Sequence, residues 1–534
     1  MRGALAGAGA LTRLYLRLDR LRLTVWILVL GIVPMGTASA FQGLYETEAE
    51  RVQFAATVTS NPAFQALLGP LYDHSIGGLT AWRVGTLGAF LLALMMVLTM
   101  IRHTRDDEET GRRELLGSTI VGRHAPLAAA LLVSAGGGLL IGIIVTAGLA
   151  GLGLPGNGAL AFGAGWAGMT LAFAAVGAVA AQMTQAGSTG RGLAVGIAGL
   201  FFVIRMAGDA GGEGVEWLSW LSPIGWFSRL RPFAGEEWWV LALWIGFAAL
   251  LIAAAVMVAA RRDVGEGAIP PRPGPDRAAA SLRSPAGLAW RLQRASLLGW
   301  TAGIGVLGLI YGGAADSIED LLADNPQLRE IFEQMGGSQT LTDAFFSAAV
   351  GIIALVATAY AIRSVLKLKV EEDLLRAEPV LATATPRARF AWSHLVYGLV
   401  GPALILAFAG ALAGATYGAA IGDVSGPLPR VLAAAMAQLP AVWVLTGITM
   451  ALYGTAPRLA SLSWGVLVLC LILGQLGQIL GFPQWSLNLS PFSHIPAIPA
   501  QDLVATPLVA LIAVAVALLA AGVVGFQRRD IPGD

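Results

Sequence analysis

Two short clusters of acidic and basic side chains recur in this chain of 534 residues. They occupy 107–123 and 371–387, each directly after a long apolar stretch, and a shift of 264 positions superposes their charged residues. The first contains Asp107, Glu108, Arg112, Glu114 and Arg123, and the second contains Glu371, Glu372, Arg376, Glu378 and Arg387. Carboxylates and guanidinium groups at such spacing can pair with one another or with opposite charges on a partner protein.

Helix stability does not explain the repeated cluster. On a continuous helix, Glu108 would pair with Arg112, and Glu372 with Arg376, with the acid on the N-terminal side. Each such pair contributes only about 0.2–0.5 kcal/mol. Membrane topology would account for the arginines, but Asp and Glu contribute little to topology. A short charged helix that projects from the membrane and docks a protein accounts for both signs of charge, so the acids favour docking.

The composition indicates a multi-pass membrane protein. Arginine makes up 32 of the 34 basic residues, which suggests a GC-rich bacterial genome and hence a bacterial cytoplasmic membrane. Hydrophobic residues make up 56% of the chain and charged residues only 13%, and the mean hydropathy is +0.71. Soluble proteins carry about 25% charged residues. A net charge of +1 gives no reason to expect a nucleic-acid partner. Cys470 is the only cysteine, which excludes an intramolecular disulfide.

The apolar stretches predict an all-α fold with about twelve transmembrane helices, since a bilayer-spanning helix needs about 20 apolar residues. The predicted spans are 23–41, 82–101, 127–152, 159–182, 190–207, 238–260, 297–315, 344–363, 390–415, 428–453, 458–481 and 505–526. Arginines gather at the span ends that face one side. By the positive-inside rule, both termini are predicted to be cytoplasmic.

Further repeated motifs divide the chain into two related halves. Leu221-Ser222-Pro223 recurs as Leu489-Ser490-Pro491, and Arg261-Arg262-Asp263 recurs as Arg528-Arg529-Asp530, at shifts of 268 and 267. The repeated order and the nearly constant shift predict two halves of six spans each. An even number of spans per half makes the two repeats parallel, related by an axis along the membrane normal.

The predicted domains are a first half over 1–263, a proline-rich cytoplasmic linker over 264–289, and a second half over 290–534. The segments 11–22 and 284–295 precede the first span of each half and have the pattern of an interfacial amphipathic helix. Two interpretations of these segments stay open, namely a mechanical role and simple anchoring by positive charge.

This organisation resembles the type-2 ABC exporter permeases. The resemblance rests on six spans per half, an amphipathic helix before the first span and a charged helix between the second and third. The stretch 104–116, with the sequence TRDDEETGRRELL, and the following Val121-Gly122-Arg123 are similar to an actinobacterial subgroup of fused two-half permeases identified as exporters of polyketide antibiotics. The resemblance covers essentially the whole chain.

The resemblance implies that the charged loops are coupling helices that sit in a cleft of an ATPase subunit. The sequence contains no G-x-x-x-x-G-K-[ST] phosphate loop, so ATP and Mg would be bound by separate subunits. Two docking loops imply two ATPase subunits per chain, and the chain itself would be a transport subunit without a cofactor. The second loop departs from the pattern, because Gly111 and Leu115-Leu116 become Leu375 and Pro379-Val380.

Polar residues inside the predicted spans are sparse. The candidates for a substrate pathway are Arg205, Gln438, Gln475 and Gln478. Arg205 lies late in the fifth span, where it would either bind cargo or extend to the outer interface. We find no mid-span Asp or Glu, which argues against a proton relay. The five histidines lack the spacing of metal ligands, so no metal site is predicted.

The outer segment between the fifth and sixth spans of each half is rich in tryptophan or proline. The family resemblance implies short re-entrant helices there, and the candidate gate residues are Trp220, Pro223, Trp226 and Pro491. The alternative is an aromatic belt at the membrane interface.

The functional hypothesis is the permease subunit of an ATP-driven ABC exporter that moves a hydrophobic drug, antibiotic or lipid-like molecule out of the cytoplasm. The alternative is an ion-coupled secondary transporter with two six-span halves, which would need ionisable residues near the bilayer centre. A membrane-embedded enzyme would need clustered catalytic residues, and the sequence shows no such cluster.

Overall fold

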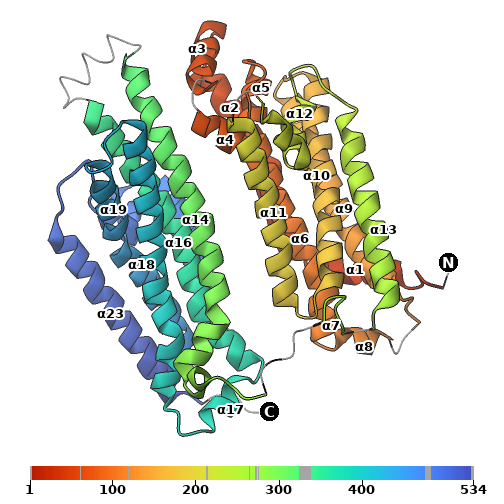
Figure 1. Ribbon diagram of the computed structural model, residues 1–534, viewed down its shortest axis with the longest axis vertical. Helices are drawn as coiled ribbons and strands as arrows, with labels where there is room; N and C mark the ends of the chain where they lie inside the picture. Colours follow the sequence, from red (N-terminus) through yellow and green to blue (C-terminus); the bar gives the residue numbers. More distant parts are fainter. Residues whose placement is uncertain are drawn as a thin grey trace. The chain divides into compact units, whose positions relative to one another are not determined.

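The computed structural model describes residues 3–59, 62–117, 120–211, 214–263, 265–270, 274, 276–323, 338–475 and 483–530. In these residues, all regular secondary structure is helical (Figure 1). The chain forms two compact units, Met1–Gly274 and Pro275–Asp534.

Eleven helices in the described residues are long and apolar enough to cross a membrane. They coincide with eleven of the twelve predicted spans, which confirms a polytopic all-α membrane protein. The remaining span was predicted over 458–481. The structure describes its first part as α21, Leu462–Gln475, and residues 476–482 lie outside the described residues.

Unit 1 places its short helices at the two ends of a bundle of long ones. In Figure 1, α1, α7 and α8 lie at one end, and α3, α4, α5 and α12 lie at the other. The elements are α1 Ala8–Leu18, α2 Arg20–Leu44, α3 Glu48–Thr59, α4 Pro62–Leu68, α5 Ile76–Thr80, η1 Ala81–Gly85, α6 Thr86–Ile101, η2 Arg102–Asp106, α7 Asp107–Glu109, α8 Arg112–Gly117, α9 Ala125–Gly151, α10 Gly156–Met183, α11 Gly187–Ala210, η3 Glu216–Leu221, α12 Gly225–Leu230 and α13 Val240–Arg261.

Unit 2 repeats the plan with fewer breaks. Its elements are η4 Ala280–Arg283, α14 Pro285–Ala323, α16 Ser338–Asp373, α17 Ala377–Leu381, α18 Arg387–Ala420, α19 Pro427–Ala437, α20 Leu439–Thr455, η5 Pro457–Leu459, α21, α22 Gln484–Leu487, η6 Pro491–His494 and α23 Ala505–Arg528. The interfacial segment 284–295 is not a separate helix here, because it forms the first turns of α14. Only unit 1 breaks this segment, at Asp19 between α1 and α2.

Small residues bring the long helices of each unit into backbone contact. A Cβ atom added to Gly142 in α9 would lie 2.6 Å from the carbonyl oxygen of Gly163 in α10. A Cβ atom on Gly522 in α23 would lie 2.4 Å from the carbonyl oxygen of Met450 in α20. Lipid tails are as apolar as leucine, so helix association inside a bilayer depends on such close packing. The packing fixes the helix ends that carry the charged clusters.

Candidate functional site

A reversal of the backbone divides each charged cluster. In unit 1, Gly111 adopts a φ of +71° between α7 and α8, a conformation that favours glycine. In unit 2, α16 ends at Asp373, and Leu375 adopts a φ of +57° before α17 begins. Gly111 and Leu375 superpose at the 264-residue shift. The two loops therefore make the same turn, although the leucine adopts this conformation at a cost of about 1–2 kcal/mol.

These breaks interrupt the continuous helix on which the predicted i,i+4 pairs rest, and the predicted pair of Glu108 with Arg112 is wrong. Glu108 and Arg112 lie on opposite sides of the turn, and Arg112 is instead near Asp107, with 3.4 Å between Nη1 and Oδ1. Glu372 belongs to the last turn of α16, whereas Arg376 is the residue that precedes α17. Neither loop is a single charged helix that projects from the membrane.

Glu108 instead points into unit 1 and binds the end of the last helix. Arg262, the residue after α13, donates from Nη2 to Oε1 at 2.8 Å and from Nη1 to Oε2 at 3.0 Å. Arg105 donates to the same carboxylate at 2.7 Å, and Arg113 also pairs with it. The Glu108 side chain is only 1% exposed. The loop between α6 and α9 is thus tied to the end of α13.

Arg123 makes a second connection to the same helix end. Its Nη2 donates to the carbonyl oxygens of Ala259 at 2.9 Å and of Arg262 at 3.0 Å. A helix C-terminus has unpaired carbonyl groups and a partial negative charge, both of which favour a guanidinium group there. We call the set Glu108, Arg123 and Arg262 the carboxylate clasp of unit 1.

Unit 2 contains a clasp of the same design, formed by Glu372, Arg387 and Arg529. Arg529, which follows α23, binds Glu372 through both terminal nitrogens, with 2.8 Å between Nη1 and Oε1. The Tyr453 hydroxyl donates to Oε2 of the same carboxylate at 2.7 Å. Arg387 donates to the carbonyl oxygens of Arg529 at 2.6 Å and of Gln527 at 3.2 Å.

The glutamate–arginine pair at the centre of each clasp is largely buried. Bidentate guanidinium–carboxylate pairs are among the stronger hydrogen-bonded contacts. Burial lowers the pKa of the Arg262 guanidinium, but an arginine begins so high that it stays protonated near neutral pH. Removing one partner of a buried pair leaves the other charge unpaired and costs about 3–5 kcal/mol.

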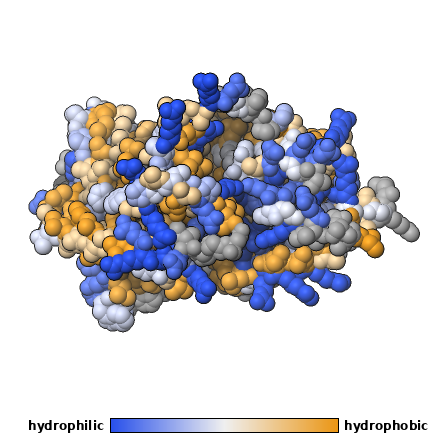
Figure 2. Space-filling view, turned by 90° about the horizontal axis from the view of Figure 1, so that it is seen from below, coloured by the Kyte–Doolittle hydropathy of each residue, from blue (hydrophilic) through white to orange (hydrophobic). Residues whose placement is uncertain are grey.

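The ten residues predicted for partner docking therefore fall into two groups. Six contribute to the interior or to the clasps: Asp107, Glu108, Arg123, Glu371, Glu372 and Arg387. Among them, Glu371 is 6% exposed and pairs with Lys367 at 2.9 Å. The other four are exposed and take no part in the clasps: Arg112, Glu114, Arg376 and Glu378. Figure 2, which views this end of the units, shows many strongly hydrophilic residues on the surface.

Sequence reasoning found the parts of the clasps but not their connection. It noted that the Arg261-Arg262-Asp263 motif recurs, and it used that motif only as evidence for the internal repeat and for topology. The signal was the similar shift of the acids and of the terminal arginines, 264 and 267 residues. Arg105 and Tyr453 carried no such signal, because each contributes through its place in the folded unit.

At the opposite end of unit 1, Arg205 is fully buried, so the prediction that it extends to the outer interface is wrong. Its Nη1 donates to Asp209 at 3.2 Å, and its Nη2 donates to the carbonyl oxygens of Leu67, at 2.9 Å, and of Ala66. Ser219 donates to the other oxygen of Asp209 at 2.6 Å. Both terminal nitrogens of Arg205 therefore have partners within unit 1, and Asp209 is a buried carboxylate that sequence reasoning missed.

The predicted gate residues of unit 1 belong largely to a packed layer formed by η3, α12 and the first turns of α13. Trp226 is 8% exposed, and its indole nitrogen donates to the Trp220 carbonyl oxygen at 2.7 Å. Trp244 of α13 donates to the Pro223 carbonyl oxygen at 3.0 Å. Trp226 is thus a core residue rather than part of an interfacial belt, whereas Trp220 is 37% exposed. In unit 2, Pro491 begins η6. Their assignment to a gate stays a prediction.

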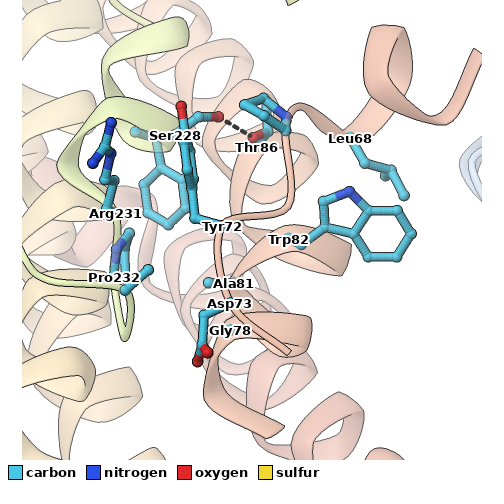
Figure 3. Close-up of a pocket in the computed structure, with 13 residues that line it drawn as sticks. Leu68, Tyr72, Asp73, Gly78, Ala81, Trp82, Thr86, Ser228, Arg231 and Pro232 are labelled. Atoms are coloured by element: carbon cyan, nitrogen blue, oxygen red, sulfur yellow. Dashed lines mark hydrogen bonds between the residues drawn. The ribbon is translucent and has the colours of Figure 1, made fainter. Parts of the chain in front are cut away.

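A small cavity beside this layer does not provide a route for cargo. Tyr72, Trp82, Ser228 and Arg231 line it, and Thr86 and Ser228 lie 3.3 Å apart between their hydroxyl oxygens (Figure 3). Its volume of about 20 Å³ has room for one or two water molecules.

The glutamines predicted for the substrate pathway stay predictions. Gln438 is 7% exposed and lies at the junction between α19 and α20. Gln475 ends α21, and Gln478 lies outside the described residues.

The buried pair in α11 gives a testable prediction for stability. Arg205→Leu or Asp209→Leu alone should lower the unfolding free energy of the purified chain, because each removes the nearest charged partner from a buried pair. Asp209→Leu should cost about 3–5 kcal/mol, and Arg205→Leu should cost less, because Arg229 remains 3.7 Å from Asp209. The unfolding free energy of the double variant should fall by clearly less than the sum of the two single-variant losses. Thermal and denaturant unfolding in detergent measure both quantities. Strictly additive losses would contradict a direct pair.

Comparisons with known proteins agree with this architecture. Residues 282–527 match the family model of the multidrug efflux system permease Rv1217c, C-terminal domain. Over 527 residues, the chain is 44% identical to the multidrug efflux system permease protein Rv1217c of Mycobacterium tuberculosis, covering 98% of this chain and 95% of that protein. The chain therefore belongs to the Rv1217c family of multidrug efflux system permeases, which are multi-pass proteins of the bacterial cell membrane.

Proposed function

We propose that this permease is driven by ATP hydrolysis in two separate ATPase subunits, which dock on the loops at 107–117 and 371–381. The main observation that supports this proposal is the clasp found in both units. In each unit, one glutamate and two arginines attach the corresponding loop to the end of the last helix. A loop attached in this way can transmit the movement of a docked subunit to a membrane-spanning helix. The sequence contains no phosphate loop, which supports ATP hydrolysis in a separate subunit as the source of that movement.

The two groups of charges would have different tasks. The residues Arg112, Glu114, Arg376 and Glu378 would contact the ATPase subunits, because they are exposed at the surface. The clasps would make each loop and the end of α13 or α23 move together. Binding and transmission are then separable properties of neighbouring residues.

For the cargo, we propose a hydrophobic or amphiphilic drug, antibiotic or lipid-like molecule. The relative's name describes multidrug efflux. The apolar character of the long helices suits such a cargo, and the buried charges of Arg205 and Asp209 are paired with each other.

The energy source can be tested in proteoliposomes that contain this chain and an ABC ATPase that co-purifies with it. ATP alone, with no ion gradient, should drive transport of a hydrophobic dye or antibiotic, and omission of the ATPase should abolish it. A proton or sodium gradient without ATP should drive none. Transport by the gradient alone would instead support the secondary-transporter alternative.

The separation of docking from transmission gives a second prediction. The charge reversals Glu114→Arg and Glu378→Arg, made together, should weaken association with the ATPase by at least about tenfold, because like charges brought together at an interface cost several kcal/mol. Glu50→Arg, an equivalent reversal on α3 at the opposite end of unit 1, serves as the control. Co-purification measures the association.

Clasp variants should behave differently in the same assay. Glu372→Gln should leave ATPase association within about twofold of wild type but reduce cargo-stimulated ATP hydrolysis, because Arg529 loses its charged partner. The exchange Glu372→Arg with Arg529→Glu should restore part of the stimulation. If Glu372→Gln abolishes association, or leaves stimulation unchanged, the clasp has no role in transmission.

A further inference from the structure

An open groove lies where α1, α2 and η2 of unit 1 meet. Its volume is about 440 Å³, and it is lined by apolar side chains and by two arginines, Arg22 and Arg102. The groove lies at the start of the first membrane-spanning helix, beside the amphipathic helix α1. It belongs neither to the clasp nor to the packed layer of η3 and α12.

The groove has an excess of positive charge. Asp19 is 1% exposed and is already occupied, because His103 contacts one carboxylate oxygen at 2.7 Å and Arg102 contacts the other at 3.0 Å. The Arg102 side chain remains 49% exposed. Among the described residues, Arg22 has no hydrogen-bond or ion-pair partner. One enclosed carboxylate therefore faces two guanidinium groups, and Arg22 is available to an anion.

One wall of the groove continues as an apolar stripe along α2. Leu21 is 76% exposed and Val25 is 52% exposed, although both are large apolar residues. Leu28 and Ile32 continue the exposed stripe at helical spacing. Since α2 is long and apolar enough to span a membrane, this stripe is available to lipid chains.

Unit 2 lacks the charged part of this groove. At the shifts that align the halves, 274 for the first span and 264 for the second, Arg22 corresponds to Ser296 and Arg102 to Leu366. Asp19 corresponds to Gln293, which contacts His394 at 3.2 Å in unit 2. The basic groove is thus a property of the first half alone and not a general consequence of the repeated fold.

We propose that this groove binds an anionic phospholipid, with the headgroup phosphate on Arg22 and Arg102 and an acyl chain along the stripe from Leu21 to Ile32. Arginine suits phosphate because its planar fork donates two parallel hydrogen bonds. Basic pockets between transmembrane helices at the membrane surface are typical sites for anionic headgroups. A free phosphate ion would leave the apolar stripe without a role, so the lipid is the occupant that fits both parts.

The test uses the full-length chain in detergent with phosphatidylglycerol or phosphatidylcholine of identical acyl chains, and native mass spectrometry to quantify bound lipid. Wild type should retain phosphatidylglycerol in preference to phosphatidylcholine. Arg22→Gln should weaken phosphatidylglycerol binding by about fivefold, the effect of one arginine near a membrane surface. The control Arg20→Gln removes the same charge on the opposite side of α2 and should have little effect.

Arg22→Gln carries the test because it breaks no observed contact, and its thermal unfolding should match wild type. Arg102→Gln should also weaken binding, but it removes the contact to Asp19 and is interpreted only if it remains folded. Equal losses in Arg20→Gln and Arg22→Gln would reduce the effect to general surface charge and overturn the proposal. So would equal retention of the two lipids by wild type. Displacement of the lipid by millimolar inorganic phosphate, with no dependence on acyl-chain length, would overturn it in favour of a simple anion site.

Discussion

The bidentate ion pair between a loop glutamate and the arginine that follows the last helix is the contact on which the loop end of each unit depends. Glu108 with Arg262, and Glu372 with Arg529, join segments about 155 residues apart in the sequence. Because the carboxylates are nearly enclosed, they cannot exchange their partners for water without a large penalty. The loop is therefore part of the bundle and not an appendage to it.

The backbone turn at Gly111 and Leu375 makes this contact possible. A continuous helix would have kept the acids and the following arginines on one exposed face. The reversal places Glu108 inside, while Arg112 and Glu114 remain at the surface. Leu375 adopts the same positive φ as Gly111, although leucine lacks the conformational freedom of glycine. The second loop therefore retains the geometry of the first although its sequence differs. One local change of direction thus separates the residues that fasten the loop from those available to a partner.

Apolar length and the internal repeat were enough to predict eleven of the spans and the matching positions of the two charged loops. They could not predict which charged residues turn inward, because that depends on the positive φ at Gly111 and Leu375 and on the position of the α13 and α23 ends. Arg205 shows the same limit. Its place near a span end suggested an exposed side chain, whereas the carbonyl groups of Ala66 and Leu67 and the carboxylate of Asp209 enclose it. In each of these cases, contacts with residues distant in the sequence determine whether the charged side chain is buried.

The two halves share their clasps but differ at their first helices, where only unit 1 has a break at Asp19 and a basic groove beside it. The central claim is that the loop and the end of the last helix move as one body. Distance measurement by electron paramagnetic resonance, with spin labels at Glu114 and Arg261 and with Cys470 replaced, tests it most directly. The account predicts the same narrow distance distribution with and without ATP in the assembled complex, and a broadened one after Glu108→Gln. A wild-type distance that shifts by several ångströms on ATP binding would contradict it.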